Sequence, residues 1–106
     1  MTSNQGFELH PGAATDITEI WEFIAQDNLP AARRVREDIL ETIRKLVQFP
    51  HQGHFRPDLT SRPLRFQTIY DYLIAYAPNK KPLLVIAVLH GRRNPRVIAA
   101  VMRERK

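Results

Sequence analysis

The chain has 106 residues, 43% of them hydrophobic and 25% charged, with a net charge of +5 and no cysteine. These values predict one domain with a packed core across residues 1–106, and they exclude a disordered chain, disulfides, thiolate metal sites and a cysteine nucleophile. The sequence has neither a signal-peptide pattern nor the roughly 20 apolar residues of a membrane helix, so we expect a cytoplasmic protein without a membrane partner.

The N-terminal part of the chain predicts a strand followed by a helix. Residues 1–6 are expected to be flexible, and the alternating residues 7–9 predict a short strand that a Pro-Gly pair ends. A helix is predicted from about Asp16 to Asp27, with Thr15 or Asp16 as its N-cap. The apolar stripe of this helix contains Ile17, Ile20, Trp21 and Ile24, and Phe23 widens it.

A second helix is predicted over residues 30–48, after a break at residues 28–30. The short joint between the two helices predicts an antiparallel hairpin whose apolar side covers a sheet. The expected core positions are Ala32, Val35, Ile39, Leu40, Ile43, Leu46 and Val47, and the expected i, i+4 ion pairs are Arg33–Glu37, Arg34–Asp38 and Glu41–Lys45.

The rest of the chain predicts a loop over residues 49–63, three strands and a last helix. The strands are expected over residues 64–69, 72–77 and 83–89, and the turn at 78–82 favours an antiparallel hairpin. The run 83–89 is apolar at every position, which is typical of a central strand covered on both faces. The last helix is expected to start at Asn94-Pro95, with Val97, Ile98, Val101 and Met102 on one side.

The order of these elements, β-α-α-β-β-β-α, predicts an α+β fold in which a helical hairpin packs on a small antiparallel sheet. Charge is distributed unevenly over this fold. Residues 1–61 contain six Lys/Arg and nine Asp/Glu, whereas residues 62–106 contain ten Lys/Arg and two Asp/Glu. The split predicts a basic face that attracts nucleic acid or an acidic protein segment. The simpler alternative is that the excess of Lys and Arg only keeps the surface hydrated.

Side chains suited to phosphate chemistry occur on the predicted strands and directly after the last one. Arginines stabilise phosphate charge and a histidine or tyrosine moves a proton, so the set is compatible with a nuclease that uses no metal. The alternatives are tyrosines packed in the core, arginines on a solvated turn or paired with the acidic helices, and a histidine that only ends its strand. The set consists of Arg65, Tyr72, Tyr76, His90, Arg92 and Arg93.

The loop residues His51, His54 and Asp58 do not predict a metal site, because a loop does not aim two histidines at one ion as a helix does. The sequence has no Gly-rich phosphate loop and no pair of carboxylates placed for acid–base catalysis. We therefore expect no metal and no cofactor.

Several short patterns follow one another along the chain. They are the early strand, A-x-x-D-I-x-x-I-W-x-F-I from Ala13, Leu29-Pro30-Ala31-Ala32, the run through Ile43, Leu46, Pro50 and Gly53, then Arg65, the Tyr72–Tyr76 strand and V-L-H-G-R-R at Val88–Arg93. In order and spacing, from Phe7 to about Arg93, they resemble the ParE/RelE superfamily of small bacterial toxins from type II toxin–antitoxin systems.

The resemblance implies a toxin held inactive by an acidic, partly disordered antitoxin that wraps its surface. RelE-like members cleave messenger RNA in the ribosome without metal, and ParE-like members block DNA gyrase. The RelE-like branch typically has an arginine after the aromatic residue of the middle strand, whereas here Tyr72 is followed by Leu73. The His-Gly-Arg-Arg ending is similar to the ParE-like branch, so the resemblance favours a gyrase inhibitor, with a ribosome-dependent endoribonuclease as the alternative.

The resemblance also implies which residues meet each partner. The expected target-binding residues are Arg65, His90, Arg92, Arg93 and Arg96, and the expected antitoxin-binding residues are Trp21, Ile24, Tyr72 and Tyr76. If the chain is a nuclease, the catalytic candidates are Arg65, Tyr76, His90, Arg92 and Arg93.

Overall fold

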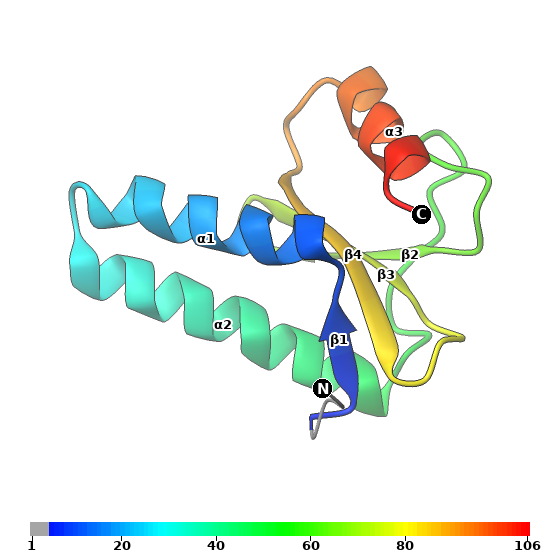
Figure 1. Cartoon of the computed structure of the whole chain (residues 1–106), viewed down its shortest axis with the longest axis horizontal. Helices are drawn as coiled ribbons and strands as arrows, with labels where there is room; N and C mark the ends of the chain where they lie inside the picture. Colours follow the sequence, from blue (N-terminus) through cyan, green and yellow to red (C-terminus); the bar gives the residue numbers. More distant parts are fainter. Residues whose placement is uncertain (1–4) are drawn as a thin grey trace.

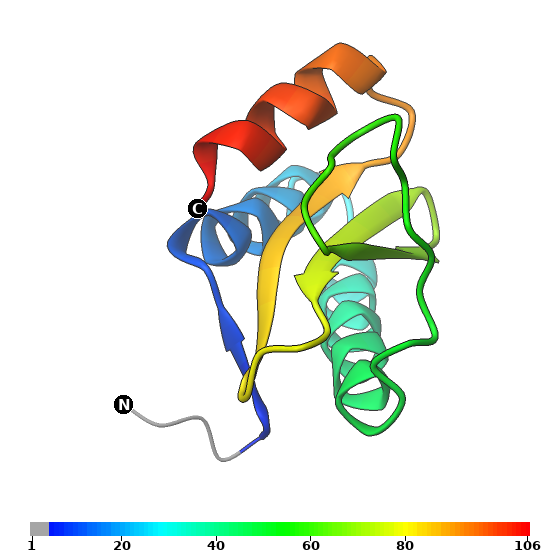
Figure 2. The ribbon, with the colours of Figure 1, turned by 90° about the vertical axis from the view of Figure 1, so that its right-hand side faces the viewer.

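In the computed structural model, which describes residues 5–106, a four-stranded sheet carries helices on both faces (Figures 1 and 2). The elements follow the expected order β-α-α-β-β-β-α, which confirms the predicted fold class. The strands are β1 (Phe7–Leu9), β2 (Arg65–Ile69), β3 (Tyr72–Ala77) and β4 (Leu83–His90), and the helices are α1 (Pro11–Ala25), α2 (Leu29–Gln48) and α3 (Pro95–Glu104).

The strands lie in the order β1-β4-β3-β2, so β4 is interior, as its continuous apolar run predicts. The β2–β3 and β3–β4 pairs are antiparallel, and the short edge strand β1 runs parallel to β4. A register shift between Ala75 and Tyr76 leaves Ile86 as the extra residue of β4. This bulge changes the alternation of side chains along the strand.

Apolar side chains from the two faces of the sheet form two separate clusters. Val85 and Val88 face the α1–α2 hairpin and pack with residues such as Ile17 and Ile43. On the other face, Ile86 and Leu89 pack with α3 and with the loop that precedes β2. The cluster there includes Leu59, Leu64, Ile98 and Met102. Both faces of β4 are therefore covered, one by the hairpin and one by the C-terminal helix.

The start of the first helix differs from the prediction. The structure begins α1 at Pro11, because proline is well suited to the first helical position, where no hydrogen bond is required of its nitrogen. His10 is the N-cap, and its Nδ1 accepts a hydrogen bond from the Gly12 N–H at 2.9 Å. Neither Thr15 nor Asp16 caps the helix, and Asp16 is a buried residue within it.

Three expectations about the helix surfaces are also wrong. Phe23 is 74% exposed and Val97 is exposed, so neither belongs to the apolar side of its helix. The i, i+4 pairs predicted for α2 are replaced by Arg44, whose Nη1 lies 3.3 Å from Glu37 and 3.0 Å from Glu41. The Glu41–Arg44 pair has the i, i+3 spacing that also brings side chains together on a helix, and the long Arg44 side chain reaches Glu37 seven positions earlier as well.

Two further expectations concern the chain ends and the membrane. The flexible segment predicted for residues 1–6 falls largely on residues 1–4, which lie outside the described residues. Within residues 5–106, no helix combines the length and the apolarity that crossing a bilayer requires.

Candidate functional site

Tyr76 is fully buried at the end of β3 nearest the 50–55 loop. Its hydroxyl donates to the Pro50 carbonyl at 2.7 Å and accepts from the Gly53 N–H at 2.9 Å. Burial raises the pKa of the phenol, which therefore stays protonated at neutral pH. Tyr76 is thus placed neither to contact an antitoxin nor to act as a general base, and the core alternative for this residue is confirmed.

Arg65 is held by the same loop. Its Nη1 donates to the carbonyls of Gly53 (2.7 Å) and His51 (3.2 Å), and its guanidinium lies 4.2 Å from the centre of the Phe55 ring. Arg65 pairs with Tyr76, whereas His90 pairs with the other end of β3. At about 3.3 Å per residue, these two ends are roughly 13 Å apart. The structure therefore does not bring Arg65 together with His90, contrary to the expectation of one basic site.

Replacing Tyr76 by phenylalanine is expected to lower the free energy of unfolding by about 1–3 kcal/mol, because the Gly53 N–H and the Pro50 carbonyl lose their partner in a buried place. Urea denaturation followed by circular dichroism measures the change. Tyr72→Phe is the matched control, and an equal loss in that variant would show that the hydroxyl bonds of Tyr76 contribute nothing specific.

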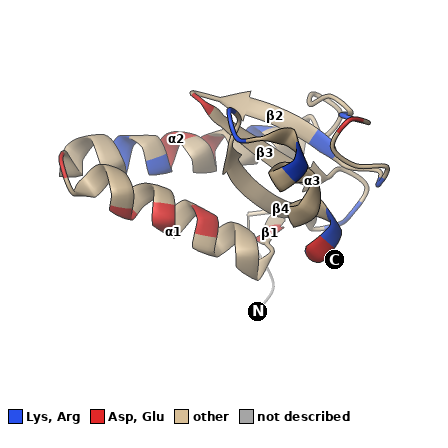
Figure 3. Ribbon diagram, turned by 90° about the horizontal axis from the view of Figure 1, so that it is seen from above, with Lys and Arg blue, Asp and Glu red and all other residues tan. Residues whose placement is uncertain are grey.

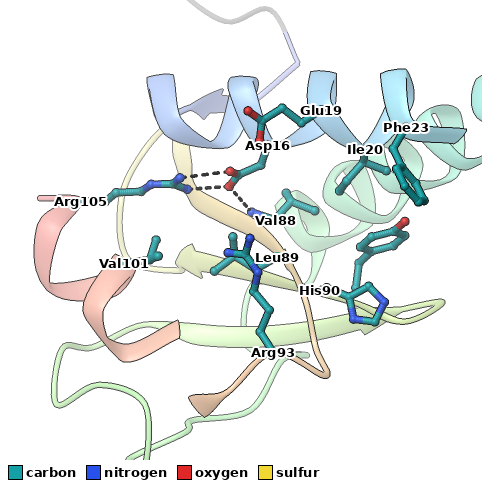
Figure 4. Close-up of a pocket in the computed structure, with 11 residues that line it drawn as sticks. Asp16, Glu19, Ile20, Phe23, Val88, Leu89, His90, Arg93, Val101 and Arg105 are labelled. Atoms are coloured by element: carbon teal, nitrogen blue, oxygen red, sulfur yellow. Dashed lines mark hydrogen bonds and ion pairs between the residues drawn. The ribbon is translucent and has the colours of Figure 1, made fainter. Parts of the chain in front are cut away.

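Three of the other candidate residues line a cleft between α1 and α3, above the C-terminal half of β4 (Figure 4). The cleft has a volume of about 430 Å³, and Tyr72, His90 and Arg93 all line it. The Tyr72 and His90 rings meet edge to face, with centroids 5.6 Å apart. Burial, and secondarily Asp71, raise the pKa of the Tyr72 phenol. These three side chains are the part of the predicted set that the fold gathers.

The predicted target-binding arginines other than Arg65 follow β4 in the sequence, and Arg93 lines this cleft. Arg92 and Arg93 are exposed in the turn after β4, and Arg96 is exposed in the first turn of α3. The nearest carboxylate to Arg92 is that of Asp71, 3.8 Å away, in an exposed pair that contributes little to stability. Figure 3 shows acidic residues along α1 and basic residues around α3. The expected antitoxin contacts Trp21 and Ile24 are partly exposed on α1.

Sequence reasoning missed the buried ion pair that forms one wall of the cleft. The Asp16 carboxylate accepts from Arg105 Nη1 at 2.6 Å and Nη2 at 3.1 Å, and also from the Val88 N–H at 3.0 Å. Hydrogen bonding to Asp16 raises the pKa of Arg105. Gly12 gives the guanidinium its room, since a Cβ there would overlap it. The available signal is an acidic residue next to the apolar stripe, but the capping pattern assigns that residue to the start of the helix.

A second arginine fixes the end of α3. The Arg62 Nη1 donates to the carbonyls of Met102 (2.7 Å) and Arg105 (2.6 Å), which the end of the helix leaves without helical partners. Together with the Asp16–Arg105 pair, this contact holds the C-terminal end of α3 to the sheet and the loop. The position of α3, and of the basic turn before it, therefore depends on side chains far apart in the sequence.

The loop residues His51, His54 and Asp58 are not grouped around one point. Asp58 is instead bound by Arg56, whose Nε and Nη2 lie 3.0 and 2.8 Å from its two oxygens. Over residues 5–106, no three His, Cys, Asp or Glu side chains are grouped as metal ligands would be.

Comparisons with known proteins agree with this fold. The structure is similar to a chain of a chromosomal ParDE toxin–antitoxin system from P. aeruginosa, with a TM-score of 0.65 and 22% sequence identity, over 79% of this chain and 92% of the other. No curated protein gives a significant sequence match. The family model described as the ParE toxin of the type II toxin–antitoxin system parDE matches residues 7–95. This match covers most of the sequence, and the chain therefore belongs to the ParE toxin family of type II toxin–antitoxin systems.

Proposed function

We propose that this toxin inhibits DNA gyrase in the cytoplasm and is neutralised by a cognate antitoxin. The observation that carries the proposal is the exposed basic segment after β4, which presents Arg92, Arg93 and Arg96 on one short stretch. The segment is anchored by the interior strand β4 on one side and by α3 on the other. A fixed group of positive charges is suited to a partner with a complementary negative surface.

The arrangement of the other candidate residues supports binding over RNA cleavage. A tyrosine general base is favoured by a lowered pKa, whereas burial raises the pKa of both Tyr72 and Tyr76. Arg65 is committed to the 50–55 loop and lies away from His90. The set of side chains that would have to act together on one phosphate is thus divided between the two ends of β3.

A supercoiling assay with purified gyrase tests the proposal. The wild-type toxin is expected to inhibit supercoiling, and the double variant Arg92→Glu/Arg93→Glu should need roughly tenfold more protein for the same inhibition, because it reverses two exposed charges at the contact. The matched control is Lys80→Glu/Lys81→Glu, which makes the same change in net charge at the exposed turn before β4. This control should retain full potency.

Two results would contradict the proposal. Unchanged gyrase activity at a large excess of wild-type toxin would remove gyrase as the target. Cuts in a translated message with codon periodicity, detected by primer extension, would favour the ribonuclease alternative.

A further inference from the structure

Phe23 is the most exposed large apolar side chain in the described part of the chain, with an exposed fraction of 74%. Figure 4 shows its ring at the margin of the cleft, and the residue lies close to the end of α1. Two other exposed rings have partners. The Phe55 ring lies against the Arg65 guanidinium, and the Tyr70 hydroxyl donates to an aspartate of α2. Phe23 has no such ring or hydroxyl contact among the described residues, so a surface that covers it would remove it from water.

The helix around Phe23 is acidic. α1 contains Asp16, Glu19 and Glu22 and has neither lysine nor arginine, as Figure 3 shows. Arg105 neutralises Asp16, whereas Glu19 and Glu22 are exposed and form no ion pair within the described residues. Glu19 precedes Phe23 by four residues and therefore lies on the same side of the helix. A surface that covers Phe23 must consequently bring positive charge to α1.

A second cavity, here called the Lys80 cavity, lies beside the β3–β4 turn and has a volume of about 280 Å³. Its basic side chains are Arg62, Lys80 and Lys106, and no Asp or Glu lines it. The two lysines are exposed, whereas the apolar lining residues are buried or half-buried; they include Leu64, Ala77, Leu84 and Ile86. A dry cavity of roughly 150 Å³ already accepts benzene. The Lys80 cavity therefore has an apolar floor with room for a phenyl ring and a basic rim.

The positive charge of this rim is not compensated within the described residues. Arg62 donates to the carbonyls of Met102 and Arg105, which satisfy its hydrogen bonds but carry no net charge. Neither Lys80 nor Lys106 forms an ion pair with a described carboxylate. A carboxylate brought to the rim by another molecule would therefore meet cations that have no counter-charge.

We propose that two copies of this chain associate head to tail, with Phe23 of one copy inserted into the Lys80 cavity of the next. Glu19 and Glu22 of the first copy then meet the basic rim of the second. Figure 1 shows the end of α1 and the β3–β4 turn on opposite sides of the molecule, so Phe23 cannot enter the cavity of its own chain. This inference does not depend on the proposed function.

The charge distribution along the chain supports this pairing. Residues 1–61 hold six Lys/Arg and nine Asp/Glu, a net charge of −3, whereas residues 62–106 hold ten and two, a net charge of +8. The acidic α1 of one copy thus meets the basic half of the next. Arg93 lines the cleft beside Phe23 and opposes an approaching cation, but the two glutamates of α1 outnumber it. Because the contact is small and the whole chain is positive, the association is weak and is strongest at low salt.

Sedimentation equilibrium of the purified toxin tests the contact. The average mass of the wild type is expected to rise with protein concentration at about 50 mM salt and to return towards the monomer at about 500 mM salt, because salt screens exposed charges. Phe23→Ala and Lys80→Glu/Lys106→Glu should each associate at least roughly tenfold more weakly. The matched control is Phe49→Ala, which alters a ring that is 62% exposed and lies outside the Lys80 cavity, and it should associate like the wild type.

A mixture of the two weakened variants gives the sharpest result. Phe23→Ala keeps an intact cavity, and Lys80→Glu/Lys106→Glu keeps an intact Phe23, so together they can make one contact. The mixture should form a 1:1 dimer with the affinity of the wild-type contact and no larger species, which also shows that both variants are folded.

Several results would overturn the inference. They are a wild type that stays monomeric at high concentration and low salt, association that Phe23→Ala leaves unchanged or that Phe49→Ala weakens equally, and a mixture in which the variants remain separate. None of these results bears on gyrase inhibition, which the supercoiling assay tests separately.

Discussion

Replacing Asp16 by asparagine is expected to lower the free energy of unfolding by about 3 kcal/mol, because the change leaves the partly buried Arg105 guanidinium without its counter-charge. Asparagine keeps an oxygen that accepts from the Val88 N–H, so the loss of stability reports the missing charge and not a missing hydrogen bond to the backbone. Urea denaturation of the purified protein measures the change. Asp58→Asn is the matched control, since its pair with Arg56 is exposed, and it should change the stability little.

A double variant that removes both charges of the ion pair shows whether the unpaired Arg105 causes the loss of stability. Asp16→Asn/Arg105→Gln removes both charges and leaves no unpaired cation in the cleft, so it should be less destabilised than Asp16→Asn alone. If the loss in the double variant equals the sum of the losses in the single variants Asp16→Asn and Arg105→Gln, the charge interaction has no net effect. A loss for Asp16→Asn no larger than that for Asp58→Asn would show that the pair is effectively solvated.

The fold could be predicted from the sequence because its signals are local. The run 83–89 is apolar at every position, and a strand covered on both faces accounts for it. The residues of the α2 stripe are spaced for one helix face, and Ile39, Ile43 and Leu46 are fully buried. In each case the pattern that predicts the element lies within a few positions along the chain, although the burial itself comes from packing against distant elements.

The parts of the site that the sequence did not predict depend on distant residues. Aspartate is a residue type that often caps a helix. Asp16 instead forms a buried ion pair, because the fold brings it next to Arg105, 89 positions later. The predicted strands carry Arg65, Tyr76 and His90, but the position of each residue along its strand, which a sequence pattern does not give, separates Arg65 and Tyr76 from His90. Phe23 fits the helical period and yet faces the cleft, because α3 leaves that side open.

Replacing Gly53 by alanine is expected to destabilise the protein by about 3 kcal/mol, because overpacking and the loss of a buried hydrogen bond act together. A Cβ at this position would lie 2.6 Å from the Tyr76 hydroxyl and 2.8 Å from the Phe66 carbonyl. The carbonyl belongs to the backbone of the sheet, which does not move aside as the end of a flexible side chain would. The loop must therefore shift and give up its contacts with Tyr76 and Arg65.

Two further variants determine whether this overlap is the cause. Gly91→Ala is the matched control, since the closest atom to its Cβ is the Asp71 carbonyl at 3.3 Å, and a small shift relieves that contact. Gly53→Ala/Tyr76→Phe removes one of the two overlapping atoms, so the double variant should lose less stability than the sum of the single variants. Additive losses, or a Gly53→Ala variant as stable as the wild type, would contradict the close packing of the 50–55 loop against β3. Arg65 donates to two carbonyls of the same loop. If the loop is closely packed against β3, Arg65 is therefore fixed in place and is not free to reach a partner.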